Sequence, residues 1–185
     1  MERRDFIKFC AASAVAAPAV AADARARFYS RARLVDANGI ALKAKAIPAN
    51  RNLIFHYPYA STPCFLLNLG RPAKASAALE TADKHPYEWR GGVGAGRSVV
   101  AYSAICPHTY THPTIESTMI HYFGPDAPAT VSQRAGVVTC CVHGSTFEPG
   151  RGAVPLQPPA EIPLATVVLE WEEATDALFA TGLLG

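Results

Sequence analysis

The sequence predicts a single, nearly all-β domain of the sandwich type, with the chemistry carried by two loops at one end. Fifteen prolines and thirteen glycines favour short strands joined by loops over long helices. Half of the 185 residues are apolar and 17% are charged, which is enough for a packed core. The formal charge of +2 gives no clustered basic footprint of the kind that nucleic-acid binding requires.

Residues 1–24 have the order of an export signal: charge, apolar run, small residues. Arg3 and Arg4, followed by an apolar pair and Lys8, resemble a twin-arginine signal, which implies export of a folded protein to the periplasm. The run Phe9–Ala22 would reach only about 21 Å as a helix, short of a hydrocarbon core of about 30 Å. We therefore expect cleavage, with a retained short anchor as the first alternative and an amphipathic helix as the second.

The remaining chain divides into residues 25–46, a linker and first strand, and residues 47–185, the domain that carries the site. Runs rich in branched and aromatic residues predict strands, and an Ala-, Leu-, Glu- and Lys-rich run predicts a short helix. The expected elements are a linker or short helix at Ala24–Arg33, strands at Gly39–Lys45, Asn52–Tyr59, Cys64–Leu69, Ser98–Ile105, Met119–Phe123 and Gly136–Cys140, a helix at Ala73–Asp83, and a hairpin of Thr166–Trp171 with Ala177–Thr181. Gly92–Gly96 lacks the Lys-Ser/Thr ending of a phosphate loop and is predicted to be a flexible hairpin loop.

Two short stretches within residues 103–160 offer metal ligands. Cys106-Pro107-His108 follows one predicted strand, and Cys140 and His143 follow another, with Gly144 next to the second His. Two Cys and two His suit either tetrahedral zinc or an iron–sulfur centre. Ser145 favours the second, because a hydroxyl at that position can donate a hydrogen bond to a cluster sulfur.

The pattern C-x-H … C-x2-H-x-S resembles that of Rieske [2Fe–2S] proteins. The resemblance implies an antiparallel Rieske-type β-sandwich in which Cys106 and Cys140 hold the inner iron, and His108 and His143 hold the outer, exposed iron. It also implies that Val154–Pro159 is the proline loop that covers the cluster, and that the histidines couple electron transfer to proton release.

The chain departs from the common Rieske pattern in three ways. Thr111 and Val142 stand where many members have a disulfide, so that clamp is missing. Phe147 replaces a tyrosine whose hydroxyl bonds a ligand sulfur, so Ser145 is the remaining donor. Thirty-one residues separate His108 from Cys140, a long segment that we interpret as a docking or solvated loop.

Two further groups of side chains could form a second metal site or a disulfide. The long segment contains His112, Glu116, His121, Tyr122 and Asp126, whose spacing fits no metal motif, so a second metal site is the weaker alternative. Cys64 and Cys141 are the other thiols outside the signal, and we expect a pair of buried free thiols, with a Cys64–Cys141 disulfide as the alternative.

Among Rieske classes, the chain is most similar to the small subunits of arsenite oxidases. Pro107 between the first two ligands, Ser145 with Phe147, the stretch Phe65–Gly70 and the export signal carry this resemblance. It implies a periplasmic electron-transfer subunit, without a complete active site of its own, between a molybdenum–pterin subunit and a cytochrome c or copper protein. The alternatives are the Rieske subunit of a cytochrome bc complex and a zinc-stabilised binding module without a redox role.

Overall fold

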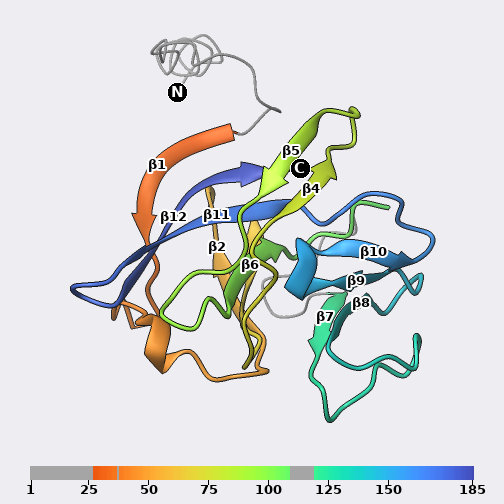
Figure 1. The fold of residues 1–185 in the computed structure, drawn as a ribbon, viewed down its shortest axis with the longest axis horizontal. Helices are drawn as coiled ribbons and strands as arrows, with labels where there is room; N and C mark the ends of the chain where they lie inside the picture. Colours follow the sequence, from red (N-terminus) through yellow and green to blue (C-terminus); the bar gives the residue numbers. More distant parts are fainter. Residues whose placement is uncertain (1–26, 37, 109–118) are drawn as a thin grey trace, which may run out of the picture.

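The structure is a computed structural model, and it describes residues 27–36, 38–108 and 119–185. These residues form three antiparallel sheets joined by turns and two short 3-10 helices (Figure 1). The all-β fold class is therefore confirmed. The predicted signal at residues 1–24 and the positions Cys10, Thr111, His112 and Glu116 lie outside the described residues.

The largest sheet has six strands in the order β1-β12-β11-β6-β3-β2. Its strands are β1 (Arg27–Arg33), β2 (Leu53–His56), β3 (Pro63–Asn68), β6 (Val99–Ser103), β11 (Thr166–Glu172) and β12 (Ala177–Leu184). The predicted terminal hairpin is confirmed as β11 and β12, which pair along their whole length.

The central strands β3 and β6 are buried on both faces because their side chains alternate between two cores. Phe65 and Tyr102 point into one cluster, whereas Leu66 and Ala101 belong to the other. Side chains alternate sides along a strand, so a strand between two cores needs apolar residues at every position. This explains why the sequence of β3, Pro63–Asn68, is a nearly continuous apolar run.

A four-stranded sheet in the order β10-β9-β8-β7 packs against one face of the large sheet (Figure 1). The hairpin of β4 and β5 contributes side chains to the core between them. The small sheet contains β7 (Ile120–Phe123), β8 (Val137–Cys140), β9 (Thr146–Glu148) and β10 (Val154–Gln157); the hairpin contains β4 (Ala77–Glu80) and β5 (Pro86–Trp89). The turn η2 (Pro149–Arg151) connects β9 to β10, and η1 (Ala44–Ala46) precedes β2.

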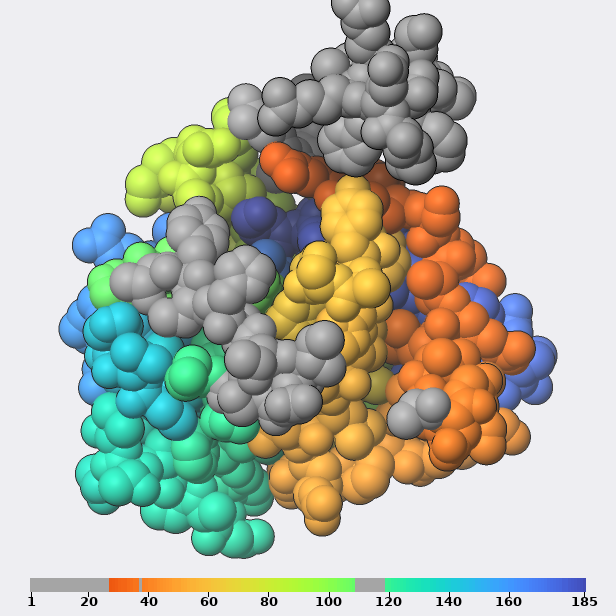
Figure 2. All heavy atoms as spheres, turned by 180° about the vertical axis from the view of Figure 1, so that it is seen from behind, coloured from red at the N-terminus to blue at the C-terminus, as the bar shows by residue number. Residues whose placement is uncertain are grey.

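The two edges of the large sheet approach each other, so the sheet is strongly curled. Tyr29 of β1 contacts Tyr57 and Tyr59, which follow β2, with ring centroids 6.0 Å apart in both pairs. Seen from behind, the region of β2 and β3 crosses the molecule between β1 and the small sheet (Figure 2). Edge-to-face aromatic pairs of this kind stabilise contacts beyond the area that they bury.

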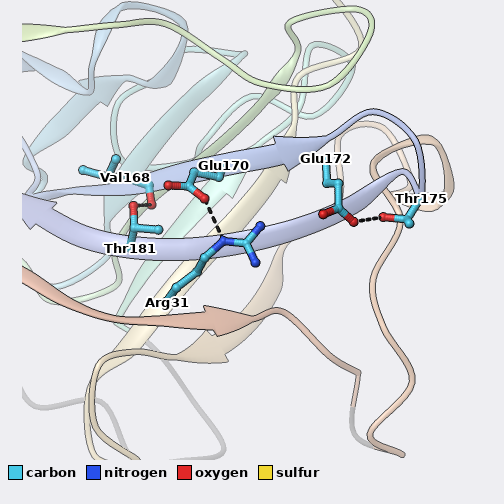
Figure 3. Close-up of polar contacts among 6 residues, drawn as sticks. All are labelled: Arg31, Val168, Glu170, Glu172, Thr175 and Thr181. Atoms are coloured by element: carbon cyan, nitrogen blue, oxygen red, sulfur yellow. Dashed lines mark hydrogen bonds and ion pairs between the residues drawn. The ribbon is translucent and has the colours of Figure 1, made fainter.

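The outer face of β1, β12 and β11 is held by a cross-strand cluster. The Arg31 guanidinium lies 3.3 Å from the ring centroid of Phe179. Figure 3 shows its second contact, in which Nε donates to Glu170 at 2.8 Å. At the end of the hairpin, the Thr175 hydroxyl donates to the Glu172 carboxylate (Figure 3). Arg31 thus ties three neighbouring strands together by stacking and ion pairing.

Several sequence-based element predictions are wrong. The segment predicted as a linker or short helix at Ala24–Arg33 contains β1, because its backbone pairs with the edge of β12. The strand predicted at Gly39–Lys45 is reduced to isolated bridges at Ala41 and Lys43, followed by η1. The helix predicted at Ala73–Asp83 is replaced by β4, whose Leu79 is buried and packs against Gly152.

No helix in the described parts of the chain has both the length and the hydropathy needed to cross a membrane.

The large and small sheets are joined by a buried hydrogen bond. The Tyr102 hydroxyl of β6 donates to the Pro149 carbonyl in η2 at 2.6 Å. Tyr102 is fully buried, and burial raises the pKa of its hydroxyl well above the usual value. A buried carbonyl that loses its donor cannot recruit water, so this contact is costly to remove.

We predict that Tyr102→Phe lowers the free energy of unfolding by about 1–3 kcal/mol, because it leaves the buried Pro149 carbonyl without its donor. The measurement is urea denaturation followed by circular dichroism. Tyr59→Phe is the matched control, since Tyr59 is 62% exposed and its change should stay within about 0.5 kcal/mol. Equal stability of Tyr102→Phe and wild type would contradict the proposed junction.

Candidate metal centre

The first ligand pair lies in the turn that directly follows β6. The Ala104 N–H donates to the Pro63 carbonyl at 3.0 Å, and the Ile105 N–H donates to the Ser103 hydroxyl at 3.2 Å. These bonds end the strand and direct the chain inward at Cys106, which is 1% exposed. His108, two residues later, is exposed at the surface. One short turn therefore presents a buried thiol and an exposed imidazole.

The second ligand pair lies in the turn between β8 and β9. The Gly144 N–H donates to the Cys140 carbonyl at 2.9 Å, and the Cys140 N–H donates to the Ser145 carbonyl at 2.8 Å. Gly144 has a φ of +82°, a left-handed conformation that a side chain would strain. Cys140 is fully buried and His143 is exposed, so this turn repeats the arrangement of the first.

The two turns bring the four predicted ligands together. Cys106 and Cys140 belong to the same buried cluster, and their thiols are close enough to interact electrostatically. The rings of His108 and His143 meet at the surface, with centroids 5.0 Å apart and planes at 80°. The structure thus sorts the ligands by depth, with both sulfurs inside the domain and both imidazoles at its surface.

The protonation of Cys106 is set mainly by its surroundings in the core. Burial raises the pKa of this thiol, because a thiolate is poorly solvated there, and the neighbouring Cys140 sulfur raises it further. The His108 backbone N–H and the Ser145 hydroxyl act in the opposite direction by hydrogen-bonding the sulfur. These donors are the groups that would stabilise negative charge on Cys106 when a metal displaces its proton.

Ser145 connects the thiols to the proline-rich segment. Its Oγ accepts a hydrogen bond from the Ala160 backbone N–H at 3.1 Å, which leaves its own proton free for the Cys106 sulfur. Ser145 is fully buried and Ala160 is 5% exposed, so water cannot replace either partner. The predicted proline loop at Val154–Pro159 is therefore anchored at its far end beside the ligands, although its first part, Val154–Gln157, forms strand β10.

The candidate ligands are arranged as two pairs, and the two kinds of metal centre need different arrangements. Among the described residues, no group of three or more His, Cys, Asp and Glu side chains is placed to hold a metal ion. A tetrahedral zinc site needs four ligands around one point, whereas a Rieske cluster is held by one pair of ligands at each end. A buried thiol pair and an exposed imidazole pair match the second arrangement.

Phe147, Cys64 and Cys141 are the other residues whose surroundings bear on the candidate site. Phe147 is fully buried in the same cluster as Cys106 and Cys140, and it carries no hydroxyl that could reach a sulfur. Cys64 and Cys141 are both free, as predicted, but Cys141 is exposed, so the prediction that both are buried is wrong. Cys64 lies in the other core, where burial raises its pKa to about 12.

The described part of the long segment between the ligand pairs is folded into the small sheet. Ile120–Phe123 forms β7, which pairs with β8 and carries His121 and the buried Tyr122. Asp126 follows in an exposed turn. A second metal site involving His112 or Glu116 falls outside the described residues. Of the two positions where the disulfide clamp is predicted to be missing, Val142 is described and is 48% exposed, whereas Thr111 lies outside the described residues.

No known protein-family profile matches the chain. Among solved structures, the chain is similar to the soluble domain of the Rieske protein II from Sulfolobus acidocaldarius, with a TM-score of 0.56 and 21% sequence identity. The match covers 84% of this chain and 78% of that one. The chain has a Rieske-like fold. At this identity the likeness is one of fold, and the Rieske-like domain must be assigned its chemistry from its own residues.

Two residues that support the candidate site were missed by sequence reasoning. Tyr102 joins β6 to η2, and Ala160 donates to Ser145 through its backbone. Tyr102 was visible only as one aromatic in a predicted strand, and a backbone donor leaves no trace in the sequence. Both become recognisable once the small sheet is placed against the large one.

Proposed function

We propose that this protein is an electron-transfer protein that binds a Rieske-type [2Fe–2S] cluster through Cys106, Cys140, His108 and His143. The observation that carries the proposal is the sorting of the ligands, two thiols in the core and two imidazoles in contact at the surface. In this arrangement Cys106 and Cys140 would hold the inner iron, and His108 and His143 would hold the outer iron. When bound, the cluster carries a single electron, and the chain performs no bond chemistry.

The side chains of this domain bind and tune the cluster. Core packing around Cys106 and Cys140 excludes water, and the Ser145 hydroxyl supplies a hydrogen bond to sulfur. The exposed imidazoles of His108 and His143 form the edge at which an electron partner would make contact.

We predict that the purified protein is coloured and contains iron and acid-labile sulfide in equal amounts, two of each per chain. Cys106→Ser should abolish the visible absorption and the visible circular dichroism, because it removes an inner ligand. Cys64→Ser is the control, since that thiol lies in the other core and its loss should leave the spectrum intact. A colourless, zinc-loaded wild-type protein would overturn the cluster in favour of the zinc-stabilised binding module.

The hydroxyl groups beside the cluster should set its potential. We expect Ser145→Ala to lower the midpoint potential, because it removes the donor to Cys106, and Phe147→Tyr to raise it, because it supplies a second one. Protein-film voltammetry at fixed pH measures both. Thr181→Ala, far from the ligands on β12, should leave the potential unchanged. A potential for Phe147→Tyr equal to or below that of wild type would refute this account.

We further propose that the protein is the small subunit of a periplasmic, arsenite-oxidase-like complex, passing electrons from a molybdenum–pterin subunit to a cytochrome c or copper protein. Pro107 between the first ligands, Ser145 with Phe147, and the twin-arginine pattern at residues 1–24 support this assignment. The second candidate is the Rieske subunit of a cytochrome bc complex, in which His143 would meet the quinol; the missing clamp at Val142 and the missing tyrosine hydroxyl at position 147 weigh against it.

Co-purification distinguishes these two assignments. We expect the protein, isolated from the periplasmic fraction of its native cell, to be accompanied by a large subunit that contains molybdenum, detected by mass spectrometry and metal analysis. Recovery in membranes together with a b-type cytochrome would instead support the quinol-oxidising complex. The twin-arginine prediction is tested in the same fractions, because replacing Arg3 and Arg4 by Lys should retain the protein in the cytoplasm.

A further inference from the structure

Three loops at one end of the domain form a basic surface. We define it by Arg71, Lys74, Arg90, Arg97 and Arg151, all of which are exposed. They lie in residues 70–76, 90–98 and 149–153, and these segments contain no Asp or Glu. Five of the thirteen Lys and Arg side chains in the described residues are therefore gathered here, although the net charge of the chain is only +2.

Backbone hydrogen bonds fix the three loops against one another. The Ala73 N–H donates to the Arg97 carbonyl and the Lys74 N–H donates to the Gly150 carbonyl, both at 2.9 Å. The Arg97 guanidinium donates to the Arg90 carbonyl at 3.0 Å. The basic surface is thus a consequence of the fold and is rigid at the level of its backbone.

The cations of the basic surface have no carboxylate partner among the residues that the structure describes. In the described parts of the chain, none of the five cations forms an ion pair with a carboxylate, whereas Arg31 elsewhere on the domain does. At physiological ionic strength the Debye length is about 8 Å, so cations on adjoining loops act together on an approaching molecule. Such a surface attracts a partner of opposite charge.

The basic surface lies at the opposite end of two strands from the metal ligands. Arg97 comes two residues before β6 begins, and Cys106 comes three residues after it ends. Strand β9 shows the same arrangement. It begins one residue after Ser145, and η2, which contains Arg151, follows its other end directly. Since β6 alone spans about 17 Å, a partner on this surface would leave His108 and His143 accessible.

We propose that this basic surface binds an acidic surface of a partner protein. This contact would be separate from the surface formed by His108 and His143. The proposal rests on the proposed function, because an electron carrier needs both an electron donor and an electron acceptor. A membrane is the weaker candidate, because the three segments contain none of the exposed large apolar side chains that would enter a bilayer. Single-stranded nucleic acid is weaker as well, because these segments contain no aromatic residue on which bases could stack.

The test uses poly-L-glutamate as the acidic probe, with the cluster-loaded full chain and calorimetry at low and physiological salt. Arg71→Glu combined with Lys74→Glu should weaken binding about tenfold or more, and added salt should weaken wild-type binding. The matched control is Arg51→Glu combined with Arg134→Glu, two exposed cations outside the basic surface; it makes the same change in net charge and should stay within about twofold of wild type. Far-ultraviolet circular dichroism verifies that all variants are folded.

Three outcomes would overturn the docking proposal. Equal losses in both double variants would mean that only net charge matters. Tighter binding to phosphatidylglycerol vesicles would indicate a membrane, and tighter binding to a single-stranded oligonucleotide would indicate nucleic acid. The visible spectrum of the same samples reports the cluster independently, so a colourless protein that still discriminates between the double variants would refute the proposed function and leave the docking surface standing.

Discussion

The site depends on one buried junction, the hydrogen bond that the Tyr102 hydroxyl donates to the Pro149 carbonyl. Tyr102 lies four residues before Cys106, and Pro149 lies four residues after Ser145. The junction therefore connects the two segments that carry the ligand pairs, although their sheets share no strand. Tyr102 and Pro149 are buried, so water cannot replace either partner, and the bond helps to keep the two loops at a defined separation.

The depth at which each ligand lies follows from how the two turns leave their strands. In both turns the cysteine is the last inward-facing position, and the histidine comes two or three residues later, after the chain has turned to the surface. The thiols are thus shielded from solvent and oxidants, while the imidazoles remain exposed. An electron carrier needs this asymmetry, because its cofactor must be protected and yet have one edge that a partner can reach.

Without a disulfide at Val142, the stability of the second loop comes from hydrogen bonding and packing. Cys140 exchanges backbone bonds with Gly144 and Ser145, and the Cys141 N–H donates to the Met119 carbonyl beyond the small sheet. The Thr139 and Thr146 hydroxyls, on paired strands, lie 3.3 Å apart in the core. These contacts are individually modest, so the loop relies on several of them forming together. At the other end of the same strands, the backbone bonds between the loops of the basic surface are of the same kind.

The sequence alone was enough to predict the candidate ligands and the strands that carry them. Cys106, His108, Cys140 and His143 stand out because metal ligands need particular atoms at close spacing, with Ser145 as a neighbouring donor. The apolar runs of β3, β6 and β8 are typical of strands buried on one or both faces. The tertiary structure decided what local patterns leave open. Ala77–Glu80 has helical propensity but forms β4, because Leu79 is buried against Gly152 and Trp89. Arg27–Arg33 is basic but completes the sheet through β12. The depth of each ligand, the Tyr102 junction and the gathering of five cations depend on contacts between residues far apart in the chain, and such contacts have no local signature.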